Sequence, residues 1–227
     1  MRSATQVTVS TFGAMMALAG IEHGIGEILQ GDRAPSGIMF PSWPGSTFFR
    51  SVAGEPAMTI IPNLLVTGIL AVLFSLIYLA WATQFVQRKH AGLILMLLAI
   101  VMLLVGGGIF PPVIGIFIGV LGTRINTPST RWRTQSAVDP RPFLARVWPW
   151  SFGVCVIGWL SLLLGTNILG YFFGVNDPNL TVILISFALG SLLLTVFSGL
   201  AHDSVRPVLS PQNSGDIPGH NQLPQPR

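Results

Sequence analysis

The sequence is poor in charged side chains. Only 9% of its 227 residues are Asp, Glu, Lys or Arg, and 51% are hydrophobic, whereas an average soluble domain is roughly 25% charged. Twelve basic and eight acidic residues are too few to cover the surface of a water-soluble globule of this size. The abundance of large apolar residues also excludes a disordered chain. We therefore expect an all-α integral membrane protein, a multi-pass bundle with the lipid bilayer as its surroundings.

Cysteine and the common catalytic motifs are also scarce. The chain has no Walker motif, no glycine-rich dinucleotide fingerprint, no HExxH, no CxxC and no GxSxG. Its one cysteine, Cys155, lies in an apolar run, where a packing role is the natural interpretation. The net charge of +4 arises from basic residues between apolar runs, which favours membrane orientation over nucleic-acid binding. We expect no cofactor and no metal, and we lean against an enzyme.

Five long apolar runs predict the membrane-spanning helices. They cover residues 7–29, 57–86, 91–123, 147–173 and 179–201. The bundle is thus assigned to residues 1–203. Residues 204–227 are rich in Pro, Gln, Asn and Ser, which predicts a disordered cytoplasmic tail.

The third run is interrupted by helix-weakening residues. Three glycines and two prolines that lack backbone donors follow one another closely: Gly106, Gly107, Gly108, Pro111 and Pro112. Two structures are compatible with this break. One is a single kinked helix, and the other is a helical hairpin with arms at about 91–107 and 112–123.

The distribution of basic residues favours the hairpin. Arg88 and Lys89 precede the third run, and five arginines follow it between residues 124 and 146. Basic loops tend to stay in the cytoplasm, and only a hairpin leaves both of these loops there. The second arm, about 18 Å of helix, is shorter than the ~30 Å hydrocarbon core. We predict five or six membrane segments in the cell membrane, with both termini cytoplasmic.

The first apolar run contains the ionisable residues Glu22, His23 and Glu27. At about 100° per residue they share one face of a helix, and the opposite face is apolar. Ionisable groups are costly inside a bilayer, so these three are candidates for a proton, cation or ligand site. His23 and Glu27 are four residues apart, a spacing at which a histidine and a carboxylate can touch and share a proton.

Small residues border this polar face at a spacing that lets membrane helices approach closely: Gly13, Ala17, Gly20 and Gly24. This helix-packing seam predicts that the polar face points at protein or at an internal cavity. The alternative is a hydrated helix end, or a polar lock that only stabilises the fold. A haem on His23 is disfavoured because the other histidines, at 90, 202 and 220, do not lie at its depth.

These features lead to a first hypothesis: a small transporter or channel-like protein with a proton or cation site on its first helix. The polar face and the broken third run would line its pathway, because discontinuous helices expose backbone groups that hold ions. An alternative of another class is a non-catalytic accessory or assembly subunit of a membrane complex with other membrane subunits. A third hypothesis is a membrane-embedded enzyme or redox protein that uses His23.

Overall fold

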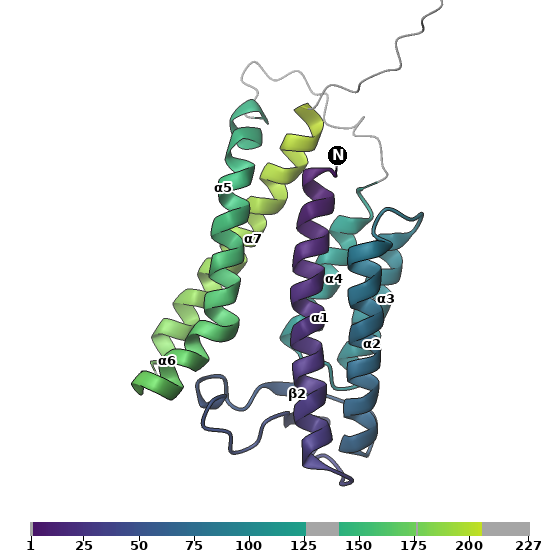
Figure 1. The fold of residues 1–227 in the computed structure, drawn as a ribbon, viewed down its shortest axis with the longest axis vertical. Coiled ribbons are helices and arrows are strands. Elements are labelled where there is room, and N and C mark those ends of the chain that lie inside the picture. Colours follow the sequence, from purple (N-terminus) through teal and green to yellow (C-terminus); the bar gives the residue numbers. More distant parts are fainter. Residues whose placement is uncertain (1, 126–140, 176, 206–227) are drawn as a thin grey trace, which may run out of the picture.

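The structure is a computed structural model that describes residues 2–125, 141–175 and 177–205 (Figure 1). The chain is mostly helical. Four helices are long and apolar enough to cross a membrane: α1 (Ala4–Gln30), α2 (Leu64–Gln84), the continuous helix Pro142–Phe173 and α7 (Pro178–Val205). The prediction of a mostly helical chain with several helices of membrane-spanning length and apolarity is thus confirmed. Residues 204 and 205 end α7, and the rest of the predicted tail lies outside the described residues.

The predicted third run folds as a hairpin of two short antiparallel helices, α3 (Ala91–Leu104) and α4 (Phe110–Gly122). Gly92 at the start of α3 lies directly against Gly119 and Gly122 at the end of α4. A kinked single helix would place these residues far apart. The 14 and 13 residues of the two helices make each arm shorter than a full membrane span.

The break differs in detail from the prediction. The first arm ends at Leu104 instead of 107, because Gly106 and Gly108 adopt φ angles of +92° and +82° that are incompatible with a right-handed helix. Pro111 and Pro112 do not interrupt a helix. They begin α4, where a missing N–H costs nothing because the first turn has no intrahelical acceptor for it.

The predicted second run, 57–86, begins as a helix only at Leu64. Strand β2 (Pro56–Met58) pairs antiparallel with β1 (Met39–Pro41), so the prediction of helix before residue 64 was wrong. Pro62 lacks a donor, and the Asn63 side chain accepts the N–H of Val66 at 3.0 Å. This N-cap fixes the first turn of α2.

The fourth long helix has three parts: α5 (Arg141–Leu160), one π-helical turn η2 (Ser161–Gly165) and α6 (Thr166–Phe173). It starts before the predicted residue 147, with Pro149 inside the helix. The Thr166 hydroxyl donates to the carbonyl of Leu162 at 2.8 Å, which supplies a partner within the π turn. Such turns are rare and frequently lie at functional sites.

The helices form two groups (Figure 1). Helix α1 packs along α2 and α4 and more lightly on α7, whereas α5 and α7 form a pair. The segment 31–63, which contains β1, β2 and the short helix η1 (Arg50–Val52), lies across the end of the bundle opposite the N-terminus. The Asp203 carboxylate accepts the backbone N–H groups of Ala4 at 2.7 Å and Thr5 at 2.9 Å, so α7 ends where α1 begins.

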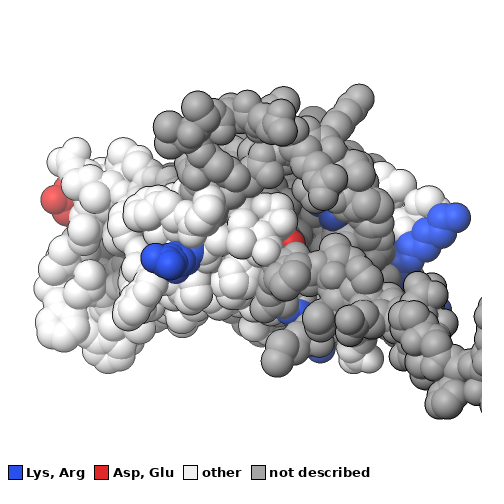
Figure 2. Space-filling view, turned by 90° about the horizontal axis from the view of Figure 1, so that it is seen from above, with Lys and Arg blue, Asp and Glu red and all other residues white. Residues whose placement is uncertain are grey.

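Basic side chains gather at the end where α1 begins. The helix ends there carry Arg2, Arg88, Lys89, Arg124 and Arg146. Figure 2 looks onto this end and shows blue Lys and Arg side chains across it. The opposite end carries three acids and two arginines: Asp32, Glu55, Asp177, Arg33 and Arg50.

Candidate functional site

The three predicted ionisable residues lie in the part of α1 nearest the segment 31–63. His23 is 2% exposed and Glu27 is fully buried. The Glu22 side chain is 31% exposed. The burial of His23 and Glu27 argues against a hydrated helix end, because protein surrounds both groups.

His23 lies between two carboxylates. Its Nδ1 is 2.9 Å from the carbonyl oxygen of Ala19 and 3.1 Å from Oε2 of Glu22. Its Nε2 is 3.4 Å from Oε2 of Glu55. A carbonyl only accepts hydrogen bonds, so Nδ1 carries a hydrogen in this arrangement. The ring is thus oriented with Nε2 toward Glu55.

Glu55 was not among the predicted site residues. Glu55 immediately precedes β2, and its side chain extends to His23. Its backbone has a φ of +57°, which is uncommon for a residue other than glycine. The Ser42 N–H donates to the Glu55 carbonyl at 2.9 Å and holds the turn. Burial raises the pKa of the Glu55 carboxyl, the Glu22 carboxylate raises it further, and the His23 imidazole opposes both.

The predicted pair of His23 with Glu27 does not form. The partners of His23 in the described structure are Glu22 and Glu55, because the segment 31–63 brings a carboxylate to the ring. Glu27 instead accepts the Ser42 hydroxyl through Oε1 at 3.3 Å. Its Oε2 is buried without a hydrogen-bond partner among the described residues. Glu27 therefore joins α1 to the segment 31–63 through Ser42.

The glycines of the α3–α4 break let the backbone approach these side chains. A methyl group on Gly106 would collide with the Glu27 carboxylate and with Thr67. A methyl group on Gly108 would lie 2.6 Å from Nε2 of His23. Gly107 lies against Met102. The broken segment thus forms one wall of the site.

The small-residue seam of α1 faces α2. Gly13 lies against Ala82, and Gly24 lies against the backbone of Gly68. Gly20 contacts Ser75, together with Met102 of α3, and Ala17 is fully buried. This close packing turns the neighbouring polar face of α1 toward the interior.

Glu22, His23 and Glu55 offer ligand atoms that all lie within 4.8 Å of one another. Among the described residues this is the one cluster of three His, Cys, Asp or Glu side chains spaced closely enough to surround a small cation. The set contains one nitrogen and two carboxylates, which suits a proton or an ammonium group as well as a metal ion.

The cluster lies in the wall of a pocket of about 550 Å³. The pocket is lined by α1, the segment 31–63, the start of α4, the region around the π turn and α7. Its lining is predominantly apolar. Leu162, Leu163 and Leu164 of the π turn all belong to it, which connects the irregular part of the fourth helix with the site.

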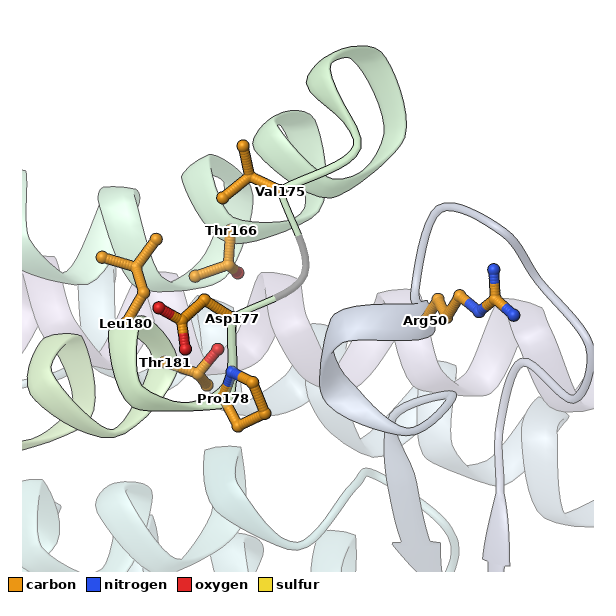
Figure 3. Close-up of a pocket in the computed structure, with 7 residues that line it drawn as sticks. All are labelled: Arg50, Thr166, Val175, Asp177, Pro178, Leu180 and Thr181. Carbon is orange, nitrogen blue, oxygen red and sulfur yellow. The ribbon is translucent and has the colours of Figure 1, made fainter.

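A smaller pocket of about 240 Å³ lies at the turn between α6 and α7 (Figure 3). Arg50 reaches it from η1, but its guanidinium points away from the carboxylate of Asp177 in Figure 3. That carboxylate accepts the N–H of Asn179 at 2.9 Å at the start of α7. Its described lining contains one acid and two threonine hydroxyls but no histidine, and its arginine is turned away, so the His23 pocket is the stronger candidate.

No family model, curated protein or solved structure matches the chain. The functional argument therefore depends on the chemistry of the His23 cluster and its pocket.

Proposed function

We propose that this protein is a small transporter of the cell membrane that binds a proton or another cation at Glu22, His23 and Glu55. The observation that carries the proposal is the position of His23, whose two ring nitrogens each face a carboxylate in the wall of a large pocket. Ionisable groups buried within membrane helices are costly and commonly mark ion pathways.

The contact between His23 and Glu55 requires a proton or another cation between the two groups. With Nδ1 donating to Ala19, the 3.4 Å approach of Nε2 to the Glu55 carboxylate is attractive only if a proton or another cation lies between the two atoms. Without it, two lone pairs would face each other. An imidazole can take up a proton on one nitrogen and release one from the other, so His23 connects the carboxylates of Glu22 and Glu55.

The proposed topology has α1, α2, the α5–α6 helix and α7 crossing the membrane. The α3–α4 hairpin enters from the same side as the chain ends and extends part of the way. Non-helical backbone at that depth must be covered by protein. The break meets this need: Ile60 donates to Leu104 at 3.1 Å, and Ile109 donates to Pro56 at 3.2 Å. The basic end of the bundle then faces the cytoplasm, with both termini.

Flux measurements in proteoliposomes test the proposal. We expect proton or alkali-cation flux driven by a membrane potential, and loss of most of this flux in Glu22→Gln, His23→Gln and Glu55→Gln. Asp32→Asn is the matched control, since this exposed acid lies at the same end of the bundle outside the pocket lining. Its flux should equal that of the wild type.

Unchanged flux in Glu22→Gln would refute the assigned site. Absence of any cation flux, together with co-purification of a fixed membrane partner, would refute transport and favour the accessory-subunit alternative. Size-exclusion elution of every variant establishes that it is folded.

A further inference from the structure

The His23 pocket has the size of a site for a small organic molecule. Its volume of about 550 Å³ lies within the roughly 300–1,000 Å³ of typical ligand pockets. A bare proton or an alkali ion needs far less space. The volume therefore points to an organic solute of several carbon atoms or more.

The pocket is open toward the surface that the apolar helices present to lipid. Several lining residues are between 45% and 57% exposed: Leu18, Phe110, Leu160 and Leu164. All four are apolar and come from both sides of the pocket, α1 and α4 on one side and the π-turn region on the other. A solute dissolved in the bilayer can therefore enter sideways without crossing a polar barrier.

The polar wall of the pocket is negative. Among the described lining residues the ionisable ones are two acids and one histidine, with no Lys or Arg. One oxygen of Glu22, Oε1, is also buried without a hydrogen-bond partner among the described residues. The Glu22 carboxylate is therefore only partly compensated by hydrogen bonds, and its side chain lines the pocket, so its charge attracts a cationic group there. An anion would face repulsion from the same wall.

Aromatic side chains complete the lining. Phe48, Phe49, Phe110 and Trp159 all border the pocket. The faces of such rings attract cations, most strongly where water is excluded. The pocket thus combines carboxylates, aromatic faces and an apolar body, the complement of a cation with an apolar frame.

We propose that the solute bound in this pocket is a lipophilic organic cation, whose charged centre lies at Glu22, His23 and Glu55 and whose apolar part lies between α1, α4 and the π turn. This inference rests on the proposed transport function for its physiological role, and it concerns the substrate class of the same site.

A pair of probes with the same shape and opposite charge provides the test. Tetraphenylphosphonium and tetraphenylborate are both apolar, so a pocket that only absorbs apolar matter would bind both. We expect saturable binding of the phosphonium to the purified full-length protein in detergent, measured by equilibrium dialysis, and no saturable binding of the borate.

Two kinds of variant separate charge from shape. Glu22→Gln and Glu55→Gln should weaken phosphonium binding about 10- to 100-fold, the effect of losing a buried interaction with a charged group. Leu163→Trp should abolish binding by filling the pocket with the cluster intact. Asp32→Asn should bind like the wild type. Thermal melts confirm that each variant is folded.

The outcomes distinguish the two proposals. Equal binding of both probes, or binding unaffected by Glu22→Gln and Glu55→Gln, would overturn the inference, as would saturable Zn²⁺ binding that the phosphonium cannot displace. Proton or alkali-cation flux without phosphonium binding would retain the transporter and reject the organic cation. Phosphonium binding without any flux would retain the site and reject transport.

Discussion

Replacing Gly106 with alanine should destabilise the protein through the contact between the α3–α4 break and Glu27. Gly106 has a φ of +92°, and a Cβ there would collide with the Glu27 carboxylate and with Thr67. Backbone strain costs about 1–3 kcal/mol, and overpacking of a filled site costs about 1–3 kcal/mol more. We therefore expect Gly106→Ala to lower the free energy of unfolding by about 2–6 kcal/mol.

Gly31→Ala isolates the backbone part of this cost. Gly31 has a φ of +82°, but a Cβ at this position would meet nothing within 4 Å. Only the strain of about 1–3 kcal/mol should then appear. Unfolding can be titrated with sodium dodecyl sulfate in mixed micelles and followed by the fluorescence of the six tryptophans. Both variants retain every backbone hydrogen-bond donor, so their difference reports the collision.

Removal of the Glu27 carboxylate provides the decisive comparison. In a Glu27→Ala background, Gly106→Ala should cost less than in the wild type, because one of its two colliding groups is gone. Additive effects of the two substitutions would refute the reasoning, as would a Gly106→Ala variant that is no less stable than Gly31→Ala. Either result would mean that the break does not pack against Glu27.

Three further predictions concern other parts of the molecule. Asp203→Asn should lower the free energy of unfolding by about 0.5–2 kcal/mol, since the charged cap of the first turn of α1 is lost, and the same detergent titration measures it. Burial raises the pKa of Glu55 above its ordinary 4.5, so the folded protein retains a proton that the unfolded chain releases. The stability that this group contributes is complete below the unfolded pKa and is lost as pH rises through the folded pKa, so the melting temperature should fall across that pH range. Glu55→Gln should flatten this part of a series of melts at different pH values, and an unchanged slope would contradict the assignment. His23 and Glu22 are the ionisable groups that face Glu55. Gly92→Ala should separate α3 from α4 and cost about 1–3 kcal/mol, because its Cβ would meet the backbone of the facing helix, whereas Gly190→Ala, with open space around it, should be nearly neutral.

The sequence predicted the elements whose signal is continuous. Long apolar runs located the membrane-length helices, and the basic loops favoured the hairpin over a kinked helix. The face of α1 that contains His23 followed from helical periodicity alone. These inferences succeed because composition and period are local properties of the chain.

Glu55 could not be found in the same way. It lies in a segment with equal numbers of acidic and basic residues. Its contact with His23 joins residues more than thirty positions apart in the sequence and depends on how the segment 31–63 folds back onto α1. The start of α2 was misplaced for a related reason: residues 57 and 58 are apolar, but they pair with β1 instead of continuing the helix. The local signals that were present are Pro62, which cannot donate, and Asn63, a good N-cap residue.

The contact of Asp203 with the first turn of α1 also bears on the order of assembly during synthesis. The acceptor lies 199 residues after the amide of Ala4, so the helix made first receives this partner last. Until α7 has been made, those amides need water, which keeps the start of α1 at the wet surface of the membrane. The far wall of the pocket, which includes Thr181 and Ile185 of α7, is missing over the same period. The nascent chain therefore closes its bundle and completes the His23 pocket in one late step.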